Sequence, residues 1–315
     1  MAQTLDLAPK KKQRQNSGYA KSHFDFGRIV GIILTPKDFT INKADLAMSE
    51  LTNAAKAADI NDRIFALPAV VGYTAQDTED KKITFGYGAE HYSNYGTYQG
   101  MFQFSDSKKA LQKVLTQFNG RQNDFKAFLV DENGLLYCTL QGDETIVGFS
   151  LSSIWTPKWK FAAENPTQLE IFIAFANAKE FNEDIHFADM GGDIMGSVPP
   201  ITDVFLDFHA NTDSPNTVTF HVRTGDNEES LLDDYGTELA ATSAWTAKVY
   251  DTGTAITISA AALITVNGEK AIKLTMTTNY PSTGSQVSIQ GAALSVWEGL
   301  GVVGFESNEP ISYTV

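Results

Sequence analysis

An asparagine–glycine pair between two runs of β-forming residues constrains the fold more than any other feature of this sequence. Asn133-Gly134 separates the apolar runs 125–130 and 135–140, and Asn267-Gly268 stands in a comparable setting in the second half of the chain. Asn-Gly is the most favourable pair for a short hairpin turn because both residues tolerate positive φ. Each pair therefore predicts two antiparallel strands joined by a tight turn.

Most other segments also have the pattern of strands. Residues 28–34, which precede Thr35-Pro36, form a continuous apolar run rich in β-branched residues, as expected for a strand buried on both faces. In residues 169–175 apolar side chains recur at every second position, which is the period of a strand. The chain is therefore predicted to be mostly β, with some α.

Two segments have helical periodicity instead. The first begins at Asn42, a suitable N-cap, and carries apolar residues on one face as far as Ala58. The second spans residues 106–118 and is followed by Asn119-Gly120, a favourable helix stop. Both predicted helices lie in the first half of the chain.

The length of 315 residues predicts two domains, because single domains usually hold about 100 to 200 residues. The composition changes at a glycine- and proline-rich stretch near residues 190–200. Residues 28–195 are predicted to form a β-rich α+β domain with two helices. Residues 201–315 contain seven or eight short β-rich runs and no recognisable helix, which predicts an all-β, immunoglobulin-like sandwich.

Charge is distributed unevenly along the chain. Residues 1–27 are polar and free of hydrophobic periodicity, which predicts a flexible arm, and they include a basic cluster: Lys10, Lys11, Lys12 and Arg14. Residues 201–315 hold four Lys or Arg against fourteen Asp or Glu, a net charge of −10. The arm is therefore expected to contact an acidic patch on a neighbouring copy rather than nucleic acid.

The sequence contains none of the well-marked catalytic or nucleotide-binding motifs, and an enzyme is not expected. The cluster Glu183, Asp184, His186 and Asp189 has no second His or Cys at ligand spacing, and it is interpreted as a solvated helix end rather than a metal site. Cys138 lies in an apolar run and is expected to be a buried, unreactive side chain. No catalytic residue, metal or cofactor is predicted.

Residues 85–102 concentrate aromatic side chains among glycines, and tyrosine offers a large contact area with a polar tip. We interpret the segment as a long hairpin or loop that docks on another subunit. The expected interface residues are Tyr87, Tyr92, Tyr95, Tyr98 and Phe102, together with the basic cluster of the arm. A stacking surface for sugars is the alternative interpretation.

A basic arm, a β-rich body with an aromatic, glycine-containing loop, and a Thr- and Ser-rich immunoglobulin-like domain together resemble the virion proteins of tailed bacteriophages. The resemblance is greatest to tail-tube proteins and to the connector rings related to them. It implies a tail-tube-like first domain and a non-enzymatic protein whose copies form a homo-oligomeric ring or tube in a tail or neck. It also implies contacts with other virion proteins and assembly in the host cytoplasm.

The resemblance implies no contact with nucleic acid except by passage through a lumen. No stretch of about 18 apolar residues occurs, so no membrane association is predicted. Charged residues stand where a secretory signal would need an apolar run. Two alternatives remain open: a capsid or capsid-decoration protein, which the basic arm would suit, and a carbohydrate-binding or adhesin module, which the aromatic residues would suit.

Overall fold

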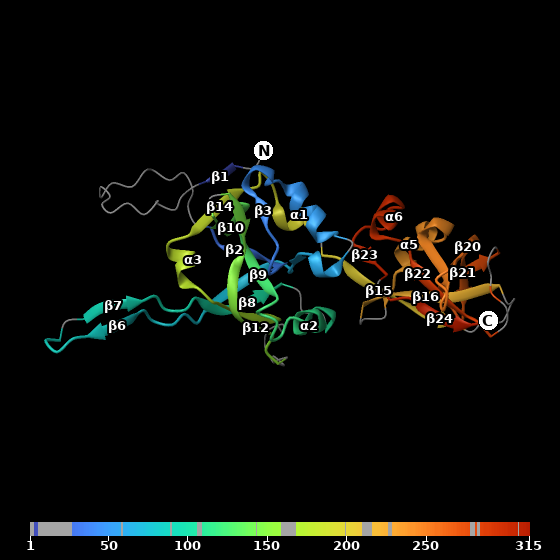
Figure 1. Ribbon diagram of the computed structural model, residues 1–315. Helices are drawn as coiled ribbons and strands as arrows, with labels where there is room; N and C mark the ends of the chain where they lie inside the picture. Colours follow the sequence, from blue (N-terminus) through green and yellow to red (C-terminus); the bar gives the residue numbers. More distant parts are fainter. Residues whose placement is uncertain are drawn as a thin grey trace. The chain divides into compact units, whose positions relative to one another are not determined.

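The chain is mostly β and divides into two compact units, Met1–Pro200 and Ile201–Val315 (Figure 1). The division falls at the glycine- and proline-rich stretch where the composition changes. The computed structural model describes residues 3–5, 27–57, 59–88, 90–105, 109–142, 144–158, 168–198, 200–209, 216–225, 229–277, 281, 284–307 and 309–315.

The first unit is organised around strand β9 (Phe125–Asp131). Along one side, β9 pairs antiparallel with β2 (Ile29–Pro36) over nearly its full length. Along the other side, it pairs at one end with β10 (Leu135–Gln141) and at the other end with β12 (Phe149–Trp155). The sheet therefore branches at β9.

One branch curls around a hydrophobic core, and the other extends to the edge of the unit. The first continues from β12 through β13 (Glu170–Phe175) and β8 (Gln99–Phe104) to β5 (Val70–Ala75). It returns close to β2, where the Leu67 amide donates a hydrogen bond of 2.9 Å to the Ile32 carbonyl. The other branch leads from β10 to β14 (Ile185–Asp189), with the short strands β11 (Thr145–Val147), β3 (Ile41–Asn42) and, beside β2, β4 (Phe65–Ala66).

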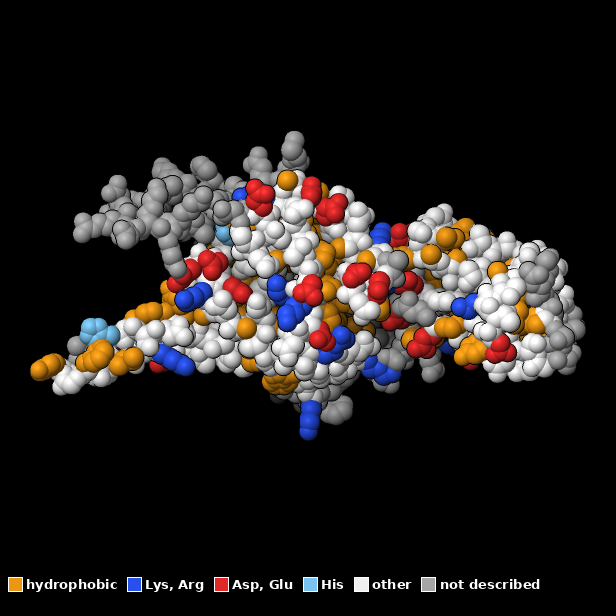
Figure 2. All heavy atoms as spheres, in the orientation of Figure 1, with side chains coloured by type: hydrophobic (Ala, Val, Ile, Leu, Met, Phe, Trp, Pro, Cys, Tyr) orange, Lys and Arg blue, Asp and Glu red, His pale blue; other side chains and the backbone are white. Residues whose placement is uncertain are grey.

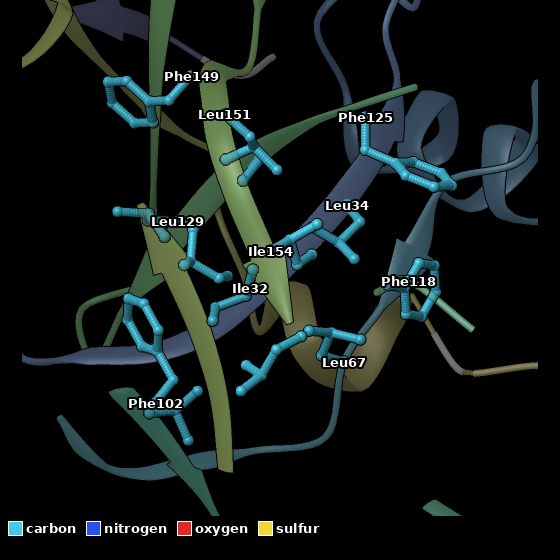
Figure 3. Close-up of a cluster of buried hydrophobic side chains, with 14 of the residues drawn as sticks. Ile32, Leu34, Leu67, Phe102, Phe118, Phe125, Leu129, Phe149, Leu151 and Ile154 are labelled. Carbon is cyan, nitrogen blue, oxygen red and sulfur yellow. The ribbon is translucent and has the colours of Figure 1, made fainter. Parts of the chain in front are cut away.

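Successive residues of β2 and β9 point into two different cores. Ile32, Leu34 and Leu129 lie in the core enclosed by the curled branch, which Figure 3 shows. Ile33 and Phe128 lie in the core on the opposite face. The prediction that the apolar run before Thr35 is buried on both faces is therefore confirmed.

Short helices close both cores. On the second core lie α1 (Met48–Ala55) and α4 (Ile194–Ser197), which contribute buried side chains to it. On the first core, α2 (Lys109–Thr116) contributes Leu115. Phe181 of α3 (Ala178–Asn182) packs against the same core and stacks on Phe149 with ring centroids 4.2 Å apart.

Helix α1 begins later than the sequence predicted, which placed its N-cap at Asn42. Asn42 instead precedes a single 3-10 turn, Lys43–Asp45, and its side chain donates to the Asp45 carboxylate at 3.2 Å. Leu46 is extended and buried, with 4% of its surface exposed, so the chain leaves the helical path to place this side chain in the core. The helix then starts at Met48.

Both asparagine–glycine hairpins are present. In the first, Gly134 has a φ of 78° and joins β9 to β10. In the second, Asn267 and Gly268 both have positive φ, 53° and 89°, and join β20 (Ile258–Val266) to β21 (Glu269–Met276). Positive φ at both turn positions is the geometry for which Asn-Gly is favoured.

The second unit consists of two sheets that share one core. The first sheet has the order β20–β21–β16–β15–β23, with β17 beside β16. The second has the order β19–β18–β22–β24. Val204 and Phe220 of the first sheet pack in the same cluster as Trp245 and Ile289 of the second. The bounds are β15 (Thr202–His209), β16 (Thr217–Thr224), β17 (Glu229–Ser230), β18 (Trp245–Val249), β19 (Ala255–Ile256), β22 (Gln286–Gly291), β23 (Phe305–Glu306) and β24 (Ile311–Thr314).

The prediction that the second unit lacks helices is wrong. It contains α5 (Leu232–Leu239) and α6 (Leu294–Gly299). Both are short and contain glycine, so their local helical signal is weak. Tertiary contacts hold both helices. The Trp245 indole donates to the carbonyl of Leu239 in α5 at 2.7 Å, and the indole of Trp297 in α6 donates to the Ala244 carbonyl at 2.8 Å.

Part of the arm also differs from expectation. Gln3–Leu5 form strand β1, which pairs antiparallel with β14. Pairing along a free sheet edge uses backbone groups, so it needs no hydrophobic pattern and leaves no signal in a polar sequence. The basic cluster of Lys10, Lys11, Lys12 and Arg14 lies outside the described residues.

The buried carboxylate of Asp131 anchors the turn between β9 and β10. It accepts hydrogen bonds from the Asn133 and Leu135 amides, each at 2.9 Å, and from the Tyr137 hydroxyl at 3.1 Å. Burial, together with the Asp131 charge, raises the pKa of Tyr137, so the hydroxyl stays protonated and remains a donor. Asp131 itself is 1% exposed.

We predict that Asp131→Ala lowers the free energy of unfolding by about 3 kcal/mol, because several buried donors lose their acceptor. Denaturant titration followed by circular dichroism measures this. The control is Asp124→Ala, which removes an exposed ion pair of 2.9 Å with Arg121; such pairs contribute roughly 0 to 1 kcal/mol. Equal losses for both variants would contradict the anchoring role.

We also predict that residues 201–315, expressed alone, unfold in one cooperative transition, since they enclose their own core. Thermal melting followed by tryptophan fluorescence reports it directly, because Trp245 and Trp297 are buried in that core. A gradual, non-cooperative change of fluorescence would show that the unit depends on the rest of the chain.

Candidate assembly surfaces

A two-stranded hairpin extends away from the sheets of the first unit (Figure 1). It consists of β6 (Lys81–Thr84) and β7 (Glu90–Asn94), which pair antiparallel with each other. Every residue of both strands is exposed. We call residues 81–94 the exposed hairpin. It follows β5 and precedes β8, so it continues the paired edge of the curled branch outward.

Hydrogen bonds between residues 76–80 and 95–98 hold the base of the exposed hairpin. The Thr78 amide donates to the Thr97 carbonyl at 3.1 Å, and the Asp80 carboxylate accepts from the Gly96 amide at 2.8 Å. Gly96 lies so close to the Thr78 carbonyl that an added Cβ would overlap it. Glycine at 96 is therefore required by the approach of the two segments.

Aromatic and aliphatic side chains are exposed on both faces of the hairpin. Ile83 and His91 are register partners, and the Phe85 ring meets the His91 ring edge-on with centroids 5.0 Å apart. On the opposite face, Tyr92 lies 5.1 Å from Tyr95, also measured between ring centroids. Figure 2 shows hydrophobic side chains gathered at the tip of this projection.

Large fractions of these apolar side chains face solvent. The exposed fractions are 50% for Ile83, 55% for Phe85 and 55% for Tyr92, and Tyr87 at the turn is fully exposed. The Lys82–Glu90 ion pair, 3.2 Å long, is the charged contact between the strands that the structure records. Exposed apolar side chains gathered in this way are a common feature of interaction sites.

The structure separates the four predicted tyrosines into three environments. Tyr87 and Tyr92 lie on the exposed hairpin, and Tyr95 is partly buried at its base. Tyr98 braces the body, because its hydroxyl donates to the Asn182 side chain at 3.0 Å and its ring lies 4.9 Å from Phe181. The interface residues predicted from the sequence did not include Ile83, which is also exposed and lies just before the aromatic run.

Phe102 is a correction to the predicted interface. Only 2% of its surface is exposed, and its ring packs in the first core (Figure 3). The physical reason is the strand period, since Phe102 and Phe104 lie on the same face of β8 and both are buried. That alternation was visible in the sequence and separates Phe102 from the tyrosines before it.

β5 is the last strand of the curled branch among the described residues, and it adjoins the base of the hairpin. Val71 and Tyr73 are 56% and 46% exposed on this strand, and the Tyr73 ring covers Gly100 and packs 4.7 Å from Phe102. Burial, with a contribution from the Asp77 charge, raises the pKa of Tyr73 to about 12. The hydroxyl thus stays protonated and donates to the Gln99 carbonyl at 3.1 Å.

The acidic cluster near His186 is a helix end only in part: Glu183 is the C-cap of α3 and Asp184 is exposed directly after it, as the sequence indicated, but the other two residues are not at the helix end. His186 and Asp189 belong to strand β14, and His186 is buried, with 8% of its surface exposed. The apolar residues Ile185 and Phe187 flank His186, and strand pairing with β10 fixes this segment. Among the described residues, no group of three or more His, Cys, Asp or Glu is arranged to hold a metal ion.

A shallow depression of about 250 Å³ lies beside α1, lined by Phe39, Thr40, Ile41, Asn42, Asp45, Glu50, Asn53 and Ala54. It contains carboxylates and amides but no nucleophile paired with a base. None of the described helices is long and apolar enough to cross a bilayer.

In comparisons with known proteins, no family model matches this sequence and no curated protein matches it. Its function is therefore inferred from its own residues.

Cys138 is buried, as the sequence indicated, and is not disulfide-bonded. Burial raises the pKa of its thiol to about 12, so almost no thiolate is present near neutral pH. We predict that the native chain reacts slowly with a thiol reagent at pH 8 and completely after denaturation. An added exposed cysteine, Ser93→Cys, is the control for reagent access. Native Cys138 reacting as fast as that control would contradict the prediction.

Proposed function

We propose that this chain is a non-enzymatic structural protein whose copies assemble into rings or a tube, as in the tail or neck of a tailed bacteriophage. The observation that carries the proposal is the exposed hairpin, which presents apolar side chains on both faces. The virion setting rests on the architectural resemblance stated for the sequence. The non-enzymatic role rests on the lack of catalytic motifs in the sequence.

An isolated two-stranded hairpin in water is only marginally stable, because it has no core of its own. The exposed hairpin has four residues in β6 and five in β7, all exposed. Burying side chains such as Phe85 and Tyr92 against a partner would contribute roughly 25 cal/mol for each Å² of apolar surface removed from water. A partner thus explains why a projecting ribbon of this composition is retained.

A second copy of the chain is the simplest partner. The hairpin projects away from the β5–β8 edge (Figure 1), and folding back onto its own sheet would break the hydrogen bonds at its base. A contact between the hairpin and a different surface on the next copy is heterologous, and repeated heterologous contacts close into rings when the rotation permits. The acidic second unit and the basic cluster at Lys10–Lys12 supply complementary charges for such contacts.

The adhesin alternative is favoured by the same side chains, since exposed aromatic rings can also stack on sugars. The capsid alternative is supported only by the basic arm. Both make a different prediction for purified protein: an adhesin stays monomeric and binds glycans, whereas a capsid protein forms closed shells.

We predict that replacing residues 81–94 by a two-residue Asn-Gly turn abolishes rings or tubes in electron microscopy of the purified protein. The fold should survive, because these residues bury nothing in either core. Circular dichroism and the melting temperature check this. Assembly that continues unchanged would show that the hairpin is not the joint.

A finer version tests the aromatic side chains alone. Tyr87→Ala combined with Tyr92→Ala should weaken assembly, since truncating a central interface tyrosine typically costs about 2 kcal/mol. The control is Tyr250→Ala, which removes a side chain that is as exposed as Tyr92, at 57%, but lies in the second unit. Normal assembly of the double variant with loss of binding to a glycan array would favour the adhesin alternative.

A further inference from the structure

Strand β20 forms an edge of the first sheet of the second unit (Figure 1). It has nine residues and pairs with β21 along its length, from Ile258 opposite Met276 to Val266 opposite Glu269. Within the residues that the structure describes, no strand pairs with its other side. Backbone N–H and C=O groups on that side are therefore available to another strand.

The composition of β20 lacks the usual protection of an edge. Its sequence, ISAAALITV, contains no charged residue and no proline. Natural sheets generally protect edges with lysine, proline, bulges or very short strands. The other strands at the ends of these two sheets are short: β23 and β19 have two residues each and β24 has four. A bulge interrupts β20 at its start, between Ile258 and Ala260, and leaves the stretch 260–266 regular.

The body of the unit holds this edge in a defined position. Leu263 packs against α5, where an added Cβ on Gly236 would lie 2.9 Å from its Cδ2. Ala261 packs at the margin of the core. The Asn267-Gly268 turn fixes the register with β21. The edge is therefore presented as a rigid strand.

The sequence of β20 is complementary to itself when it is reversed. With two copies antiparallel and Ala262 opposite Ala262, Ala261 meets Leu263 and Ala260 meets Ile264 within the regular stretch. Apolar residues thus face apolar residues there. Such contacts between side chains of neighbouring strands stabilise an antiparallel pair.

No like charges oppose this pairing at close range. The nearest charged neighbour of Ala262 in the sheet is Lys273, its register partner on β21. In a joined sheet the two Lys273 residues would stand three strand spacings apart, roughly 14 Å. That separation exceeds the Debye length of about 8 Å at physiological ionic strength.

We propose that β20 is a docking edge for β20 of a second copy. The two strands pair antiparallel about a twofold axis at Ala262 and join the two second units through one continuous sheet. This contact is isologous and uses a surface in the second unit, so it is independent of the exposed hairpin.

Cysteine cross-linking in the full chain tests the pairing and its register. Opposed residues in an antiparallel pair have Cα atoms about 4.5 to 5.5 Å apart, which is within the range for a disulfide. Ala262→Cys should therefore form a covalent dimer under mild oxidation. The buried Cys138 does not compete. Thr246→Cys, an exposed position on the interior strand β18, is the matched control and should remain monomeric on a denaturing, non-reducing gel.

The same experiment in the chain shortened at residues 81–94 separates the two surfaces. A covalent Ala262→Cys dimer that still forms there shows that β20 pairs without the hairpin. Ala262→Lys should abolish the dimer in sedimentation equilibrium of the shortened chain, whereas Thr246→Lys should leave it intact. Monomers for the shortened chain, or equal cross-linking of the two cysteine variants, would overturn the proposal.

Discussion

The burial of β9 on both of its faces is the constraint on which the first unit depends. Phe128 and Leu129 are neighbours in sequence, yet they lie in different cores. The pairing of β9 with β2 on one side and with β10 and β12 on the other therefore positions both cores at once. The curled branch, with the exposed hairpin beyond it, is joined to β9 through β12 and contacts β2 where it returns.

The sequence predicted features that are encoded locally. Asn133-Gly134 identified a hairpin because the turn itself demands positive φ, and the apolar run of β2 identified a strand buried on both faces. Features that arise from tertiary contacts were missed. Helix α5 contains Gly236, a poor helix former, yet glycine there accommodates Leu263 from β20. Helix α1 starts later in the chain than predicted because Leu46 is buried. An N-cap rule considers only local sequence and does not include such burial.

The candidate interface was predicted in part. Tyr87 and Tyr92 were identified because glycines and aromatics concentrate around them, and both are exposed on the hairpin. Phe102 was wrongly added because composition was given more weight than the strand period. The edge at β20 had a signal in its uncharged sequence, but only the sheet order reveals that one side of the strand has no described partner.

The exposed hairpin is attached to the first unit at one end, so a small rotation at its base would produce a large displacement at its tip. Between Asp80 and Tyr87 the ribbon spans seven residues, or roughly 23 Å at a rise of about 3.3 Å per residue. A rotation of about 10° at the point where Gly96 packs against Thr78 would then displace the tip by roughly 4 Å, because the ribbon length estimated from the rise per residue is roughly 23 Å. Such a rotation would move the tip without moving the side chains of either core, because the strands of the hairpin are exposed along their whole length. Copies joined through it could adapt to curvature while their bodies remain rigid.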